Sequence, residues 1–520
     1  MPVVQQGTVN TTSLILPDLY VQIVPPQNLV LNGVPTNIIG VVGTASWGPV
    51  NEPTIVGSMA DYAQSFGALM PRKYDMGTQV ATAVQQGAQS FRCVRVTDDT
   101  DTAAYSILPG TNASFAAVYT GSLGNSIAIT LAQSSKPATW RLSVLVSGFE
   151  PEIYDGLTGD GAVFWNNLAA AVNTGLGPQR GPSMLVVASA GGSTASPAPF
   201  SLTLGSTSAG SDGATSVSST QLVGSDSSTR TGMYALRGQG CGLALLADCD
   251  DSTTWSVEAE FGLQEGIYMI LTTPAGDTIS NAVTTKAQAG LDSYSAKLMF
   301  GDWLWWSDQV NTVVRLVSPQ GFAAGRLANL SPEQSSLNKP IYGIIGSQRT
   351  GAPGSGQNSA YSSADLTALI AAGIDIICNP QPAGSFWGVR GGHNTSSNQA
   401  IDGDDYTRLT NYIAATLAAG MGQYVGTVIN STLFAQIRST QLSFLNNMLA
   451  QGLLGSTDGS VPFSVICDTS NNPSSRTSLG YVQSDAQVQY QAINERFIVN
   501  VEGGQTVQVA RQTLPTGQIS

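Results

Sequence analysis

The sequence predicts a multidomain protein of mixed α+β and α/β class. Two α/β scaffold domains are expected to carry a β-rich peripheral insertion and extended N- and C-terminal arms. The first observation is length, because 520 residues exceed what one hydrophobic core usually supports. The second is the alternation of helical and strand patterns, which appears in two blocks of the chain. The third is a long stretch rich in Ser, Thr, Gly and Ala that interrupts the first block.

Residues 1–30 are predicted to form an extended N-terminal arm. The segment lacks helical periodicity and contains four prolines, which interrupt regular structure. An apolar strand from Ile38 to Val42 follows it and is expected to lie in a core. We therefore interpret the segment as an arm that leaves a scaffold strand.

Residues 31–100 and 236–350 are predicted to form the middle α/β domain. Ser58 and Asp61 give a capping-box pattern ahead of a short helix, and Gly67 is placed to end it. The remaining elements are expected in this order: a helix over 75–89, a strand over 91–96, a helix over 255–264, a strand over 267–271, a further element over 287–300 and a strand over 311–317.

Residues 101–235 are predicted to form a separate β-rich insertion at the periphery. Short alternating runs such as 126–131 and 142–146 are typical of half-buried strands, and 189–231 is rich in small polar residues. This stretch interrupts the middle domain, which resumes after it.

Residues 355–495 are predicted to form a second α+β domain, and 496–520 a C-terminal strand arm. Ser362 and Asp365 cap a helix that ends at Gly373. Further helices are expected over 405–419 and 431–451, and strands over 374–378, 463–468, 482–490, 497–501 and 505–509.

Composition limits the partners of the chain. Charged residues make up only 11% of it, under half of the roughly 25% typical of soluble domains. A surface of this kind suits packing against copies of the same chain, and it equally suits a β-rich extracellular protein. The net charge of −13 disfavours nucleic-acid binding. The sequence shows no signal peptide or run of about eighteen apolar residues, so we expect no direct membrane insertion.

No motif predicts chemistry, and we expect no catalytic residue, cofactor or metal site. The single histidine, His393, lies in a glycine-rich loop without a nucleophile motif, which favours a solvated loop residue. The run Gly238–Gly242 lacks the third glycine of a dinucleotide fingerprint. Acidic clusters at 98–101, 248–251 and 402–405 fit no EF-hand and are explained by turns and helix caps. The aromatic run 303–306 could stack on a sugar or base, but such a run beside a strand is more often part of a core or a subunit interface, and we favour the interface.

The chain resembles a known family in an ordered set of segments. Leu19-Tyr20-Val21-Gln22, Gly33-Val34-Pro35-Thr36-Asn37-Ile38 and Gly48-Pro49-Val50-Asn51-Glu52-Pro53 resemble the N-terminal signature of contractile tail sheath proteins of bacteriophages and related injection particles. Pro319-Gln320-Gly321-Phe322, Trp387-Gly388-Val389-Arg390, Phe463-Ser464-Val465-Ile466 and Glu495-Arg496-Phe497-Ile498-Val499 continue it in family order. The set covers about two-thirds of the chain, 101–235 matches nothing, and Gly391-Gly392-His393 departs from the family pattern.

The resemblance implies a structural subunit, not an enzyme, that stacks as a helical sleeve of rings around an inner tail tube. It also implies that the second domain faces the tube, that tube, baseplate and tail terminator proteins are partners, and that the protein is part of the virion tail, assembled in the host cytoplasm. A surface-layer or secreted β-rich protein and an α/β enzyme stay open as alternatives.

The two chain ends are predicted to exchange strands between subunits. Both ends are apolar or alternating, and unpaired they would be exposed edges prone to aggregation. Pairing them with neighbouring copies would remove that liability. The residues expected in this exchange are Leu19, Tyr20, Val21, Gln22 and Ile23 at the N-terminal end, and Phe497, Ile498, Val499, Asn500 and Val501 at the C-terminal end.

Overall fold

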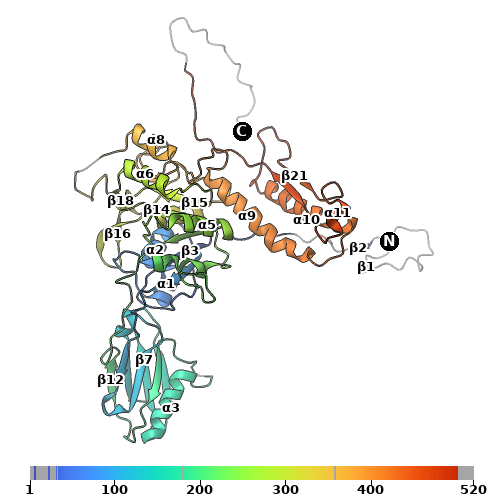
Figure 1. Ribbon diagram of the computed structural model, residues 1–520. Helices are drawn as coiled ribbons and strands as arrows, with labels where there is room; N and C mark the ends of the chain where they lie inside the picture. The colour runs from blue at the N-terminus through green and yellow to red at the C-terminus, as the bar shows by residue number, and fades with distance from the viewer. Residues whose placement is uncertain are drawn as a thin grey trace, which may run out of the picture.

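A six-stranded sheet lies at the centre of the molecule (Figure 1). The computed structural model describes residues 5–6, 22–23, 31, 33–178, 180–356 and 359–501. The strand order is β15-β14-β13-β3-β5-β4, and the strands are parallel except β4, which pairs antiparallel with β5. The strands are β3 (Ile39–Gly43), β4 (Thr54–Val56), β5 (Phe91–Arg95), β13 (Leu243–Leu246), β14 (Tyr268–Thr272) and β15 (Ala296–Met299).

Helices cover both faces of this sheet and give it two hydrophobic cores. Alternate residues of β3 serve the two sides: Ile39 and Val41 lie in one core, and Val42 lies in the other. The first core is covered by α1 (Met59–Phe66), α2 (Met76–Gln85) and α7 (Gln320–Ala328). The second is covered by α4 (Ser219–Val223), η4 (Gly232–Leu236), α5 (Trp255–Glu265), α6 (Ile279–Ala289) and α8 (Ser363–Ala371). The predicted mixed α/β class is confirmed.

Local signals place α1, α2, α5 and α8 close to where the sequence predicts them, whereas α4, η4 and α7 were not predicted. The Asp61 amide donates to Ser58 Oγ at the start of α1, and Gly67 ends the helix at a φ of 79°. Ser362 and Asp365 form a reciprocal capping box on α8. The element expected over 287–300 proves to be two, the end of α6 and the strand β15, because Gly290 ends the helix in the left-handed region.

Two smaller sheets extend the central body. An antiparallel sheet has the order β17-β16-β18, and a two-stranded one joins β19 to β20. Their strands are β16 (Leu304–Asp308), β17 (Val313–Val317), β18 (Ile344–Ser347), β19 (Ile377–Cys378) and β20 (Gly388–Val389).

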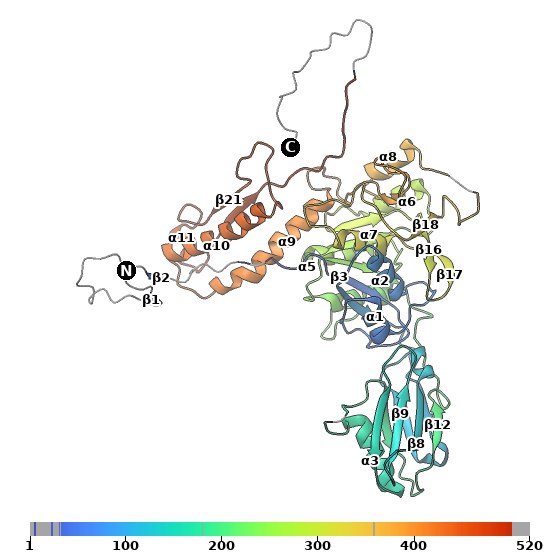
Figure 2. The same ribbon diagram turned by 180° about the vertical axis from the view of Figure 1, so that it is seen from behind.

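The insertion forms a lobe of its own, seen below the central body in Figures 1 and 2. Its two antiparallel sheets, β10-β9-β8-β12 and β11-β7-β6, enclose a separate hydrophobic core with α3. The two ends of the lobe meet, since the Asp98 amide donates to the Gly213 carbonyl over 2.8 Å. The elements are β6 (Tyr105–Ile107), η2 (Pro109–Thr111), β7 (Ala113–Ala117), η3 (Ser122–Ser126), β8 (Ala128–Gln133), β9 (Trp140–Leu145), β10 (Glu152–Leu157), α3 (Gly161–Thr174), β11 (Val186–Ala190) and β12 (Phe200–Thr203).

The last part of the chain forms a second lobe, joined to the body through the long helix α9 (Figure 2). A small core of α9, α10, β21 and β22 side chains includes Leu409, Phe444, Leu445 and Val465. Its elements are α9 (Asp404–Met421), η5 (Gly422–Tyr424), α10 (Ser431–Ala450), β21 (Phe463–Ile466), α11 (Ser474–Thr477) and β22 (Asp485–Val488).

The cores and the predicted domain limits do not coincide at two places. Val217, Leu222 and Met233 fall within the expected insertion but pack in the second core of the central sheet. Leu369 and Ile376 fall within the expected C-terminal domain and pack in the same core. The reason is that apolar residues on both sides of these limits cover the same face of the sheet. The domain limits themselves stay a prediction.

Candidate assembly surfaces

The predicted N-terminal exchange residues are described only in part. Leu19, Tyr20 and Val21 lie outside the described residues. Gln22 and Ile23 form β2 (Gln22–Ile23), which pairs in parallel with β1 (Gln5–Gln6) of the same chain. The exchange of this arm between subunits stays a prediction.

The predicted C-terminal exchange residues are described and exposed. Residues 497–501 form no strand in this chain. The side chains of Phe497 and Ile498 are about four-fifths exposed, and Val501 is 86% exposed. Large apolar residues in a row at such exposure mark a surface that other protein covers.

A two-stranded ribbon in the C-terminal lobe offers places for added strands. β21 and β22 pair antiparallel with each other, and the sheet contains no third strand among the described residues. Ser464, Ile466 and Gln487 of this ribbon are exposed. Each strand therefore has an outer edge whose backbone groups lack a ladder partner in the described chain.

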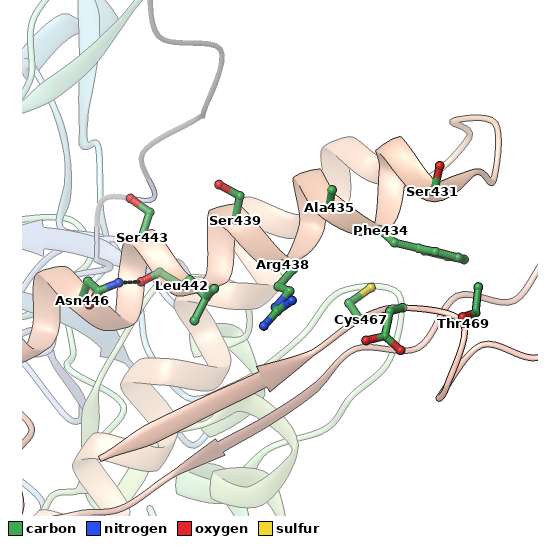
Figure 3. Close-up of a pocket in the computed structure, with 11 residues that line it drawn as sticks. Ser431, Phe434, Ala435, Arg438, Ser439, Leu442, Ser443, Asn446, Cys467 and Thr469 are labelled. Atoms are coloured by element: carbon green, nitrogen blue, oxygen red, sulfur yellow. Dashed lines mark hydrogen bonds between the residues drawn. The ribbon is translucent and has the colours of Figure 1, made fainter. Parts of the chain in front are cut away.

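A groove of about 710 Å³ runs between α10 and the end of β21 (Figure 3). Phe434, Arg438 and Leu442 point from α10 towards the segment that carries Cys467, while Ser439 points away from it. Phe434, Ala435 and Leu442 give the groove apolar contacts, and its other lining residues are mostly polar. A groove of this kind beside the end of a strand suits an extended peptide segment.

The segment that leads to the N-terminal arm packs along α9. The Val34 amide donates to Thr416 Oγ1 over 3.2 Å. A Cβ atom at Gly33 would come within 1.8 Å of Tyr412 Oη, so a side chain here would have to displace the Tyr412 ring. Leu31 is buried in the core of the C-terminal lobe. Leu31, Gly33 and Val34 are thus held on α9, the helix that the C-terminal segment also contacts.

A fully buried ion cluster ties the start of α9 to the central sheet. Lys297 Nζ on β15 lies 2.6 Å from Asp375 Oδ2 and 2.9 Å from Asp404 Oδ1, and none of the three side chains is exposed. Tyr268 donates to Asp404 over 2.7 Å, and the hydroxyl of Ser336 donates to the same carboxylate. Because buried charges are stable only when paired, this contact holds α9 in a fixed place on the body.

The shifts in pKa within this cluster agree with stable pairing. Burial alone would lower the pKa of Lys297, but the attraction of Asp375 and Asp404 outweighs it and the pKa is raised. Burial would likewise raise the pKa of Asp404, and Lys297 reverses this so that the pKa is lowered. Lys297 and Asp404 therefore stay charged at neutral pH. A lysine within the apolar run Ala296–Met299 is the sequence signal that could have revealed the cluster.

His393 is not the solvated loop residue that the sequence predicts, and its side chain is only 12% exposed. Its Nε2 lies 2.9 Å from Glu495 Oε1, and its Nδ1 lies 3.5 Å from Asp402 Oδ2. The expectation failed because Glu495, far along the chain, folds back onto this loop.

The other motifs have structural roles. The loop Gly238–Gly242 precedes β13 and lines a cavity of about 410 Å³ beside α9. Asp98 accepts from the Thr100 and Ser216 amides, and Asp251 accepts from Ser219 and Thr253. Asp251 acts in a turn, as predicted, and so does Asp98. The prediction fails for 402–405, because α9 has no side-chain cap and Asp404 belongs to the buried ion cluster. Among the residues that the structure describes, no group of three His, Cys, Asp or Glu residues could hold a metal ion.

The tryptophans at 303–306 belong mainly to the core, so the favoured subunit interface is wrong for two of them. Trp306 is 3% exposed and donates from Nε1 to Gln85 Oε1 over 3.0 Å. Trp303 is buried as well, and its Nε1 donates to the Thr273 carbonyl. The difference arises because β16 packs into the first core of the central sheet. The periodicity of the sequence alone could not predict this packing.

The carboxyl ends of β3 and β13 are filled by the chain itself, although this edge of the sheet is where α/β proteins usually bind ligands. The Thr44 amide donates to the Tyr74 carbonyl over 2.7 Å after the end of β3. After β13, buried Asp248 accepts from Gln79, which also donates to Ser318. The central sheet thus serves as a scaffold at this edge. No described helix is long and apolar enough to cross a membrane.

The fold is that of contractile sheath proteins. The crystal structure of a sheath tail protein from Desulfitobacterium hafniense has a TM-score of 0.57 at 15% identity, over 86% of this chain and 93% of that one. A sheath tail protein from Listeria innocua has a TM-score of 0.59 at 13% identity, over 85% and 90%. The sheath of the extracellular contractile injection system PVC, in its contracted state, has a TM-score of 0.54 at 12% identity, over 96% and 99%. No family model and no curated protein matches the sequence.

Proposed function

We propose that this chain is the structural subunit of a contractile tail sheath. Subunits polymerise as a helical sleeve of stacked rings around a tail tube, and contraction drives the tube through the host envelope. The likeness to sheath structures over 90% or more of their length supports the proposal. A tube protein, baseplate and tail terminator are the implied partners, and the virion tail, assembled in the host cytoplasm, is the implied location. We propose no catalytic role, because the polar groups of the central sheet are used in packing.

The exposed C-terminal segment carries the proposal of strand exchange. Residues 497–501 expose apolar side chains in one copy, while β21 and β22 expose unpaired edges in the next. An added strand would make about five backbone hydrogen bonds, each contributing roughly 0.5–1.5 kcal/mol net. The groove beside α10 gives side chains of the incoming strand a place to pack. A joint of this kind can persist while subunits rotate against each other.

The geometry of α9 suits a polymer with two joints per subunit. The N-terminal segment lies along the second half of α9, and the C-terminal segment crosses its first turns, where Tyr490 Oη lies 3.1 Å from Thr410 Oγ1. These two contacts are about 9 Å apart along the helix. Leu31 faces Gly420 near the end of α9, and Glu495 contacts His393, which is bridged to Gly403 at its start, so the two segments leave α9 near its opposite ends. Head-to-tail contacts that do not close on themselves build a helical tube.

Truncation tests the proposal directly. A chain that stops at Asn494 should give a folded, soluble subunit that forms no tubes by negative-stain microscopy, and a chain without residues 1–24 should behave likewise. Because truncation removes many groups, Ile498→Pro is the sharper variant, since proline cannot donate to a strand ladder. Ile498→Val is its matched control and should assemble normally. Tubes of normal length from the truncated chain or from Ile498→Pro would refute strand exchange by this arm.

A further inference from the structure

The segment from Tyr490 to the exposed residues 497–501 is attached to the body at two points. The first is on α9, where the Tyr490 ring packs edge-on against Tyr406 with ring centres 5.8 Å apart. The second is five residues further on, where Glu495 reaches His393. Beyond Glu495 the described chain is exposed, and Arg496 is 79% exposed at its side chain. Glu495 is therefore the root from which the arm leaves.

His393 is a fixed point for this root because its own backbone is bound to the buried ion cluster. The His393 amide donates to Asp375 Oδ2 over 3.2 Å, and its carbonyl accepts from Lys297 Nζ over 3.0 Å. The ring stands between two carboxylates, with Asp402 on the Nδ1 side and Glu495 on the Nε2 side. A carboxylate only accepts hydrogen bonds, so Nε2 donates to Glu495.

We propose that His393 is a positioning residue that holds the root of the C-terminal arm through Glu495, so that the arm leaves α9 in a fixed direction before a neighbouring subunit takes it up. This inference rests on the proposed function. Fixing the root reduces the conformational freedom that the arm loses when it joins another copy, and such preorganisation favours association. The chain's one histidine thus acts on assembly through the position of a strand.

Proteolysis of the free subunit tests the contact without requiring assembly. Chymotrypsin should cleave after Phe497, and release of the terminal fragment can be followed by mass spectrometry. We expect roughly fivefold faster cleavage in His393→Ala and Glu495→Ala, the scale of losing one charge-assisted hydrogen bond. Glu495→Gln keeps an acceptor and should lie between these variants and the natural chain. Asn494→Ala, which changes the exposed residue on the other side of Glu495, is the matched control and should be cleaved at the rate of the natural chain.

The double variant separates a direct contact from two unrelated effects. If His393 acts through Glu495, chymotrypsin should cleave the double variant, which carries His393→Ala and Glu495→Ala, no faster than either single variant. Additive acceleration, or unchanged cleavage in Glu495→Ala, overturns the proposal. Glu495 lies at the surface, so its variants test the contact even where His393→Ala fails to fold.

Tube formation tests the consequence for assembly. The same variants should raise the protein concentration needed for tubes roughly fivefold while tubes still form. An unchanged concentration refutes the role in assembly. Failure of the proposed function looks different, because the natural chain would then form no tubes, while proteolysis of the free subunit would still report on the contact between His393 and Glu495.

Discussion

Glu258 shows at the scale of one residue how burial changes the charge of a side chain. The side chain is 1% exposed on α5, and its Oε2 has no hydrogen-bond partner among the described residues. Thr254 donates to Oε1 over 2.8 Å. Burial raises the pKa of this carboxyl to about 8. Glu258 is thus protonated in the folded chain at neutral pH, whereas it is ionised when the chain unfolds.

The protonation of Glu258 predicts a stability that falls as pH rises. Between pH 4.5 and about 8 the folded state holds a proton that the unfolded state has lost, so the free energy of unfolding decreases across this range. Glu258→Gln removes the titration and should be more stable than the natural chain by a few kcal/mol at pH 9, since each unit of pKa difference corresponds to about 1.4 kcal/mol. Urea unfolding at pH 5 and pH 9 measures this difference.

A control on the same helix isolates the effect of burial. Glu260 is exposed, so Glu260→Gln should give the same pH dependence as the natural chain. A Glu258→Gln variant whose stability changes with pH as the natural chain's does would show that Glu258 is ionised in the folded state.

The contacts of His393 and Lys297 could not be predicted from the sequence, because their partners lie far along the chain. A loop position and glycine neighbours predicted a solvated His393, because local sequence carries no information on Glu495, 102 residues away. Lys297 was missed for the same reason, since both of its carboxylate partners lie far along the chain. Caps such as Ser58 were predicted because the residues that form them lie within one helical turn.

At the scale of elements, helix α7 packs against α2 through its own glycines, Gly321 and Gly325. A Cβ atom at Gly325 would lie 2.5 Å from Ala83 Cα and 2.6 Å from the Ala83 carbonyl oxygen. Both are backbone atoms of α2 and cannot move aside without moving that helix. The glycine therefore sets the distance between the two helices.

Gly325→Ala should destabilise the subunit by about 1–3 kcal/mol, the range found for overpacked cores. Gly422→Ala is the matched control, because a Cβ there meets nothing within 4 Å and the residue has helical φ and ψ. The control should be neutral or slightly stabilising. Thermal unfolding measures the melting temperatures of Gly325→Ala and Gly422→Ala. Equal melting temperatures would show that α2 and α7 can move apart at little cost.

Elements were predicted better than their assembly. Helices α1, α5, α8, α9 and α10 lie close to their expected ranges because apolar periodicity and caps are local signals. The strand expected over 374–378 shrinks to β19, which starts at Ile377. Its ladder depends on β20, and pairing between distant segments is not encoded in either segment alone.

At the scale of the whole molecule, the insertion is attached by narrow connections. The Asp98 amide and the Gly213 carbonyl are hydrogen-bonded, so the chain enters and leaves the lobe at one point. The lobe also contacts the body through Arg95, which donates to the Thr120 and Asp212 carbonyls, and through Trp47, which packs in the lobe's core. A module with its own core and adjacent ends can be removed with little effect on the rest.

Deleting residues 99–212 and joining the ends with a short Gly/Ser linker should leave a folded subunit that still forms tubes. Stability should fall by a few kcal/mol, because Trp47 becomes exposed and Arg95 loses two carbonyl partners. Circular dichroism and negative-stain microscopy measure fold and assembly.

A longer deletion, of residues 101–235, is the contrasting variant and should not fold. It also removes Val217, Leu222 and Met233 from the second core. The shorter deletion failing to form tubes while folded would show that the insertion takes part in subunit contacts, against its predicted place at the periphery of the sleeve.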